Sequence, residues 1–278
     1  MLTQSPAPAT ATETPSIVPV TAAPTVDATA GLVDAALTFA EAAGYDVVSE
    51  TAAVLDRHAA GYEPSVLWRV AIPVSGEAGP AILNVYLDDA RTVRVAEAEL
   101  GFPVEPNGSA ISRADAIAEA VRVLGLVGIA TAPHDLSIWS SIPGQLWTLG
   151  LDRDIDGHPV ANHWAATGLA GDRVWVTLNG AGRLAELYAV RPERDIAADV
   201  LSNAELTDRL AEVAGLTQAD LAVLDPSLIW LRALDQEGVE STTLSLNYCA
   251  TRTGTSGWES WCVDASSGEP SAHGLAAD

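Results

Sequence analysis

A short hexapeptide recurs three times along this chain and constrains its fold more than any other feature. The three copies end at Trp68, Trp147 and Trp230, and each has proline four residues before tryptophan and leucine or isoleucine directly before it. A spacing of roughly 80 residues between copies indicates repeated small domains rather than one large domain. We therefore predict that the three tryptophans are core anchors, each filling the space between a helix and a sheet.

The same succession of apolar periodicities surrounds each hexapeptide. A helix is expected near Leu32–Ala43, and two further helices begin where Ser112 with Asp115 and Ser202 with Glu205 form capping boxes. Alternating apolar residues after each helix predict three or four antiparallel strands. A helix packed across a curved antiparallel meander buries both apolar faces, so the predicted fold class is α+β, with three tandem repeats of this unit.

Composition shifts divide the chain into four parts. Residues 1–28 are rich in proline, threonine and alanine and are expected to form a disordered tether. Repeat 1 spans 29–105, repeat 2 spans 106–195 and repeat 3 spans 196–278. Within the tether, Ile17–Val20 is apolar and is suited to adding as a strand to an exposed sheet edge.

Two turn signals stand out in the second repeat. Asn179-Gly180 lies between apolar strands, and both residues tolerate a positive φ angle. Residues 154–160 also form an expected hairpin loop. Both signals place the chain reversals of an antiparallel meander in this segment.

The charge of the chain limits its partners. The formal net charge is −23 over 278 residues, and all 14 basic residues are arginine. Such a surface repels phosphate groups, so neither nucleic-acid binding nor direct membrane-surface binding is expected. A solubilising acidic surface is the ordinary interpretation, while basic partners and divalent cations remain open alternatives.

The start of the chain and its cysteines both bear on localisation. Met1 leads directly into the Pro/Thr/Ala tract, which suggests a mature extracytoplasmic protein whose signal or lipid anchor was removed. Cys249 and Cys262 flank a turn-rich loop and are predicted to form a disulfide across paired strands, with two reduced buried cysteines as the alternative. A disulfide would imply an oxidising compartment.

Repeat 2 carries a resemblance to a known family. Its helix start Ile111–Ala116, the hairpin Ile155–Val160 and the strand–turn–strand Val174–Leu184 resemble the PepSY and peptidase-propeptide group. The hairpin is also similar to that of YycH/YycI-type regulatory proteins. Repeats 1 and 3 share only the closing strand, at Val85–Asp88 and Trp261–Asp264. The resemblance implies a cystatin-like fold and an extracytoplasmic, non-catalytic domain that binds or restrains a partner protein.

An acidic stretch in the second repeat suggests a metal site. Asp152, Asp154 and Asp156, followed by Gly157, match the opening of a calcium loop, but the twelfth position is His163 instead of a bidentate glutamate. These four side chains are a weak candidate metal site, and a solvated acidic hairpin is the ordinary alternative. No cofactor is expected otherwise.

Motifs for the common catalytic classes are missing from the sequence. There is no strained serine elbow and no glycine-rich phosphate loop. The leading hypothesis is a non-enzymatic extracytoplasmic binding or regulatory protein that acts on another protein. One alternative is a filament subunit that self-associates by donating the strand Ile17–Val20, and another is a metal-dependent hydrolase or calcium-binding adhesin.

Overall fold

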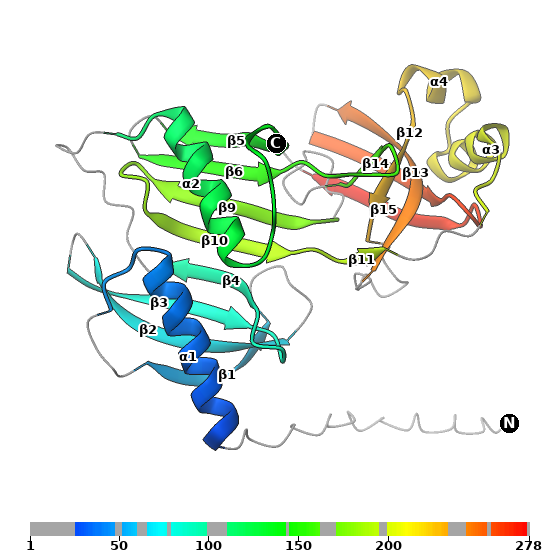
Figure 1. Ribbon diagram of the computed structural model, residues 1–278. Coiled ribbons are helices and arrows are strands. Elements are labelled where there is room, and N and C mark those ends of the chain that lie inside the picture. The colour runs from blue at the N-terminus through cyan, green and yellow to red at the C-terminus, as the bar shows by residue number, and fades with distance from the viewer. Residues whose placement is uncertain are drawn as a thin grey trace, which may run out of the picture.

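The computed structural model is a mixed α+β structure with antiparallel sheets and few helices (Figure 1). It describes residues 26–47, 52–59, 66–76, 79–98, 110–142, 145–161, 171–194, 199–232, 243–254 and 257–276. Most of the predicted tether, the segment Ile17–Val20 and the candidate ligand His163 lie outside these residues.

The larger sheet has eight strands in the order β1-β2-β3-β4-β10-β9-β6-β5. Their bounds are β1 Ala53–Ala59, β2 Val66–Gly76, β3 Gly79–Leu87, β4 Val93–Ala98, β5 Leu136–Ile142, β6 Leu146–Leu151, β9 Arg173–Asn179 and β10 Leu184–Val190. In the middle of this order, β4 pairs with β10 in antiparallel register. The segments expected to be repeats 1 and 2 therefore share one continuous sheet.

Helices α1 (Val26–Ala42) and α2 (Arg113–Leu126) cover one face of this sheet (Figure 1). Alternate strand residues point toward them, and together they form one apolar core that includes Phe39, Ile72, Val123, Val176 and Leu149. Burying a side chain of this size stabilises the fold by roughly 1.5–3 kcal/mol. Helix α1 begins six residues before the expected Leu32, inside the segment predicted to be a tether.

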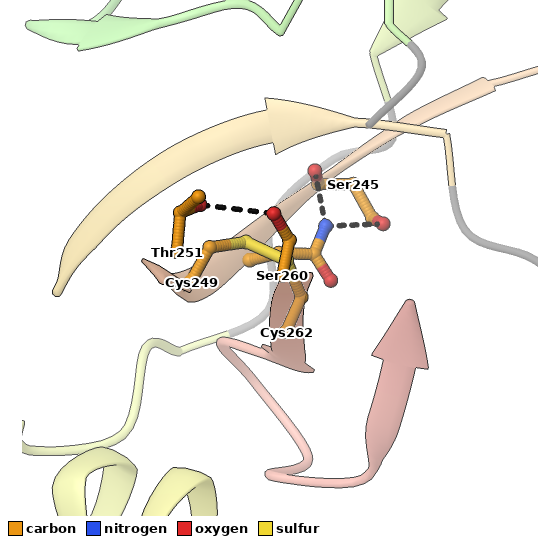
Figure 2. Close-up of a disulfide and its surroundings, with 6 residues drawn as sticks. Ser245, Cys249, Thr251, Ser260 and Cys262 are labelled. Atoms are coloured by element: carbon orange, nitrogen blue, oxygen red, sulfur yellow. Dashed lines mark hydrogen bonds between the residues drawn. A yellow bond between two sulfur atoms is a disulfide. The ribbon is translucent and has the colours of Figure 1, made fainter. Parts of the chain in front are cut away.

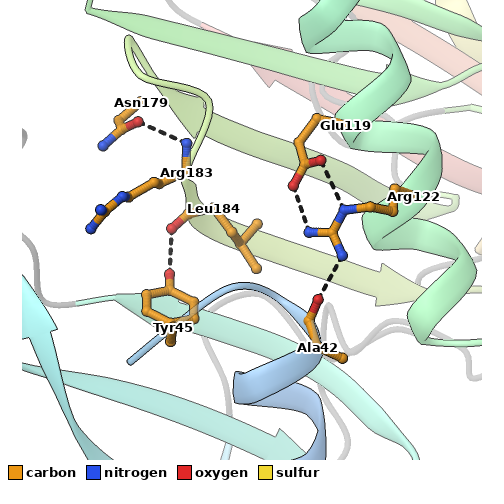
Figure 3. Close-up of polar contacts among 7 residues, drawn as sticks. All are labelled: Ala42, Tyr45, Glu119, Arg122, Asn179, Arg183 and Leu184. Carbon is orange, nitrogen blue, oxygen red and sulfur yellow. Dashed lines mark hydrogen bonds and ion pairs between the residues drawn. The ribbon is translucent and has the colours of Figure 1, made fainter. Parts of the chain in front are cut away.

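Polar contacts also tie the two halves of the sheet together (Figure 3). The Tyr45 hydroxyl, just after α1, donates to the carbonyl oxygen of Leu184 in β10, and burial raises the pKa of Tyr45. From α2, Arg122 Nη1 donates to the carbonyl oxygen of Ala42 at 2.6 Å while the same guanidinium pairs with Glu119. The orphan carbonyl at the end of α1 thus gains a partner from α2.

The smaller sheet joins β11 (Glu193–Arg194), β12 (Ser227–Leu231), β13 (Thr243–Gly254), β14 (Gly257–Asp264) and β15 (Pro270–Ala276). Helices α3 (Asn203–Ala214) and α4 (Gln218–Val223) pack beside it. The predicted capping box of Ser202 and Glu205 is confirmed, and Gly215 ends α3 in the left-handed region with φ of 64°. Trp261 of β14 is buried in the apolar core beneath α3, together with Leu206 and Leu210 of that helix.

A short hairpin that follows β6 packs against the smaller sheet and so links the two sheets by contact. Strands β7 (Asp154–Ile155) and β8 (His158–Pro159) are joined by Asp156 and Gly157, whose φ angles are 54° and 84°. Trp230 Nε1 donates to the Ile155 carbonyl at 3.1 Å, and the Trp230 carbonyl accepts from the Ala161 N–H at 2.8 Å. Trp230 is buried against Val160 and Leu244. The prediction that it packs under a helix is therefore wrong, because it packs against this hairpin.

The other two hexapeptide tryptophans take different places. Trp68 and Trp147 are half-buried and pack at the margin of the core under α1 and α2. Each lies in the second strand of its segment, because β1 and β5 precede them. These two strands are the edges of the eight-stranded sheet, and the alternation of apolar residues did not predict them.

The turn after β9 also differs from the prediction. Neither Asn179 nor Gly180 has a positive φ angle, and the left-handed position is Gly182, with φ of 84°. The Asn179 side-chain oxygen accepts hydrogen bonds from the N–H groups of Ala181 and Arg183. Asn179 therefore stabilises the turn through its side chain and not through its backbone angle.

Cys249 and Cys262 form a disulfide between directly opposite positions of β13 and β14, with Cα atoms 4.2 Å apart (Figure 2). Both are buried, and Ala161 and Leu231 pack against them. The bond therefore lies on the face of the small sheet that meets the segment after the connecting hairpin. Closing a loop of this length is worth about 3 kcal/mol in the chain-entropy account.

The disulfide leads to a first prediction. Protein kept from reductant should show no alkylated thiol by mass, and Cys249→Ala/Cys262→Ala should lose about 3 kcal/mol of unfolding free energy in urea. Reductant should lower the wild-type stability to that of the double variant and leave the variant unchanged. Two alkylated cysteines in unreduced protein would contradict the bond.

Candidate functional site

The face of the eight-stranded sheet opposite the helices carries two straight cross-strand rows. The aromatic row, from β2 to β5, consists of Arg69, Tyr86, Val95, Tyr188, Trp175, Gly150 and Ser137. The polar row beside it consists of Ala71, Asn84, Glu97, Glu186, Thr177, Thr148 and Ser140. Successive side chains of a strand alternate between faces, so both rows point away from the helix-covered core.

Stacked rings make the aromatic row rigid. The rings of Trp175 and Tyr188 are stacked with centroids 4.0 Å apart, and Trp139 lies 6.2 Å from Trp175. A bulge between Ile138 and Ser140 leaves Trp139 outside the regular pairing, and its indole lies directly over Gly150. A Cβ atom on Gly150 would stand 1.6 Å from the indole ring, so glycine is required for this close approach.

Two carboxylates lie directly opposite each other in the polar row, Glu97 on β4 and Glu186 on β10. The Tyr188 hydroxyl donates to Glu97 Oε1 at 2.9 Å. Trp175 Nε1 and Thr177 Oγ1 each donate to Glu186 Oε2 at 3.2 Å. The donors come from the rigid aromatic row and its neighbours, so both carboxylates are held in fixed orientations.

Burial and the neighbouring carboxylate both act against a negative charge on Glu186. Burial raises the pKa of Glu186, the hydrogen bonds from Trp175 and Thr177 lower it, and the charge of Glu97 raises it further. Burial likewise raises the pKa of Tyr188, and Glu97 adds to that effect. Like charges directly opposite in a sheet repel, so a cationic group placed against both carboxylates would be attracted. We call Glu97, Glu186, Tyr188 and Trp175 the carboxylate–aromatic cluster.

A second buried charge lies where the two sheets meet. Asp172 is 1% exposed, and its Oδ2 lies 2.8 Å from Arg153 Nε. Burial raises the pKa of Asp172 to about 6, although Arg153, Arg191 and Arg232 all act to lower it. Arg232 Nε donates to the Gly171 carbonyl at 3.1 Å, directly beside Asp172. This cluster joins the residues just before β9 to the residue just after β12 and is a structural link.

The predicted metal ligands occupy the connecting hairpin. Asp152, Asp154 and Asp156 are exposed there, and His163 lies outside the described residues. Among the described residues, no three His, Cys, Asp or Glu side chains lie close enough together to hold a metal ion. Asp156 and Gly157 form the turn of the hairpin that receives Trp230, which gives this acidic stretch a structural role. Calcium binding stays a prediction.

Sequence reasoning did not single out the carboxylate–aromatic cluster. Glu186 and Tyr188 are two residues apart in a strand, as are Val95 and Glu97, so each pair shares one face. That period-two signal was visible locally. The pairing of β4 with β10, which sets Glu97 opposite Glu186, joins positions about 90 residues apart and leaves no local signal.

Comparisons with known proteins give a limited result. No protein-family model matches the chain, and no curated protein matches it. Among solved structures, the chain is similar to the Bacillus megaterium YpeB C-terminal domain, with 12% sequence identity over 87% of this chain and 95% of that chain, at a TM-score of 0.43. No helix in the described part of the chain is long and apolar enough to cross a membrane.

The contact between Trp139 and Gly150 yields a second prediction. Gly150→Ala should displace the indole from Trp175, lower the unfolding free energy by about 1–3 kcal/mol and change the near-ultraviolet circular dichroism. Gly125→Ala is the matched control, since a Cβ there meets no atom within 4 Å. The control should be neutral or slightly stabilising in helix α2. Equal stabilities for the two variants would refute the contact.

The buried Asp172 yields a third prediction, on pH. Its pKa is raised from 3.8 to about 6 in the folded protein, so the folded state binds more protons between these values. The stability that protonated Asp172 supplies is therefore present below pH 4 and lost as pH rises through 6. Relative to Asp172→Asn, wild-type stability should fall by about 3 kcal/mol over that range in urea titrations.

The exposed Asp152→Asn serves as the control for this experiment. It removes one carboxylate from an exposed position and so controls for the change in net charge. A wild-type curve that runs parallel to that of Asp172→Asn from pH 4 to pH 7 would show that Asp172 is not shifted.

Proposed function

We propose that this protein is a non-enzymatic binding protein that acts outside the cytoplasm through contacts with another protein. The observation that carries the proposal is the carboxylate–aromatic cluster at the centre of the eight-stranded sheet. Glu97 and Glu186 are directly opposite, are held by Tyr188, Trp175 and Thr177, and are partly buried. A rigid surface of this kind suits a basic side chain of a partner.

The charge of the whole chain supports a basic partner. A net charge of −23 without any lysine raises the rate at which a basic surface approaches and disfavours acidic competitors. At the cluster itself, a guanidinium or ammonium group would relieve the repulsion between the two carboxylates. The stacked Trp175 and Tyr188 rings next to them are buried, so they hold the carboxylates in place and a partner would meet the carboxylates themselves.

The finer fold assignment belongs to the same proposal. We take residues 29–105, 106–195 and 196–278 as three copies of one PepSY-like, cystatin-like unit, with the first two fused through β4 and β10. The order of elements supports this, since α1, α2 and α3 are each followed by an antiparallel meander. The disulfide between Cys249 and Cys262 is compatible with an extracytoplasmic protein.

The absence of catalysis is also proposed and not shown. Both central carboxylates accept hydrogen bonds from side chains of the sheet itself, as expected for groups that orient a bound partner. The sequence has no serine elbow or phosphate loop that would indicate a common reaction class. No cofactor enters this proposal.

The proposal is tested with charge-neutral variants of the cluster, our fourth prediction. Full-length protein should capture a specific basic protein from surface extracts, and Glu97→Gln/Glu186→Gln should bind the purified partner at least about tenfold more weakly in calorimetry. The control Glu212→Gln/Glu269→Gln removes the same charge from exposed positions and should bind like wild type. Thermal unfolding should verify that both double variants are folded.

Two outcomes would overturn the proposal. One is equal affinity of both double variants for the captured protein, which would place the contact elsewhere. The other is hydrolytic turnover in wild type that is lost in Glu97→Gln/Glu186→Gln, because it would make the carboxylates catalytic.

A further inference from the structure

The edge of the eight-stranded sheet at β5 is unusually suited to accept another strand. β5 is the last strand in the order, and in the described residues it pairs only with β6. Its seven residues, Leu136–Ile142, include no charge, no proline and no glycine. Ser140 and Ser141 are exposed, and Ile142 is 47% exposed. Unprotected edges of this type are templates for strand addition.

The opposite edge of the same sheet is different. The sequence of β1 includes Asp56 and Arg57, and charged residues are common in the sequences of edge strands. Both edge strands contain a bulge, so the difference between them lies in charge. In a protein with a net charge of −23, an uncharged edge is a place where two copies can meet without local repulsion.

The chain carries a matching uncharged segment before α1. Ser16–Thr21 includes the apolar run Ile17-Val18-Pro19-Val20 and has no charged residue. The beginning of α1 lies at the β1 end of the sheet, and its other end is held to α2 by Arg122 (Figure 1). The segment therefore starts from the side of the molecule that is remote from β5.

Distance rules out addition to β5 of the same molecule. Seven strand spacings separate β1 from β5, which is about 33 Å. From Val26, the five residue steps back to Thr21 span at most about 18 Å. The segment cannot lie along its own β5, although it can reach the β5 edge of a neighbouring molecule.

We infer that Ser16–Thr21 of one molecule adds as a strand to the β5 edge of a second copy. The contact is head-to-tail, because the donated segment and the accepting edge are different surfaces, so it builds chains of molecules. It uses none of the residues of the carboxylate–aromatic cluster, and it stands whether or not that cluster binds a partner.

Proline fixes the register of the donated strand. Pro19 has no N–H to donate, so it must face outward from the new edge, and the N–H groups of Val18 and Val20 then face β5. Val18→Pro should therefore abolish the pairing, whereas Pro19→Ala should preserve it. Both changes lie in the segment before the described fold, so neither disturbs the folded core.

Sedimentation velocity of the full chain over a range of concentrations tests this fifth prediction. Wild type and Pro19→Ala should self-associate, and Val18→Pro should associate at least about tenfold more weakly. Ser141→Lys places a charge on the accepting edge and should weaken association equally. Ala118→Lys adds the same charge on the exposed side of α2 and should associate like wild type. A synthetic peptide of residues 14–22 should bind Val18→Pro protein and lower hydrogen exchange in β5.

Each contrary result removes the inference. A wild-type chain that stays monomeric at high concentration would overturn it. Association that persists in Val18→Pro would show that another surface, such as β5 against β5, joins the copies. Peptide protection of β1 in place of β5 would show that the accepting edge is β1.

Discussion

The pairing of β4 with β10 is the interaction on which the rest of the structure depends. It turns two helix-covered meanders into one eight-stranded sheet, and it brings Glu97 opposite Glu186. Without it, β4 and β10 would be two open edges, and neither cross-strand row would be continuous. Tyr45, which reaches from the end of α1 to Leu184 of β10, stabilises the same junction from the helix side.

This pairing has an electrostatic cost that its surroundings offset only in part. Two carboxylates directly opposite each other repel, and burial of Glu186 adds to the cost of its charge. The hydrogen bonds from Trp175 and Thr177 act in the opposite direction and lower the pKa of Glu186, and the Tyr188 hydroxyl donates to Glu97. Apolar residues at these two positions would avoid this cost, and for that reason the binding role proposed above is placed at this pair.

Local chemistry explains which parts of the fold were predictable. The caps at Ser112 and Ser202 were foreseen because a capping side chain acts within one turn of a helix. Strands β1 and β5 were missed, since charges in one and serines in the other break the alternating apolar signal that marks a strand. Strand pairing is set by tertiary packing, so neither the shared sheet nor the carboxylate–aromatic cluster could be derived from the sequence. Asn179-Gly180 marked the turn between β9 and β10 correctly, but the side chain of Asn179, and not its φ angle, stabilises that turn.

The hexapeptide that suggested repeats shows how tertiary context changes the use of one motif. Trp68 and Trp147 lie at the margin of a core that helices α1 and α2 cover. Trp230 instead packs against the hairpin of the preceding segment. That hairpin was the acidic stretch suspected of holding calcium. Its turn residues Asp156 and Gly157 set the backbone so that the Ile155 carbonyl meets the indole of Trp230. At the junction between the two sheets, the hairpin β7–β8 covers Trp230 in the place where a helix was expected. The ion pair of Asp172 with Arg153 lies beside that contact.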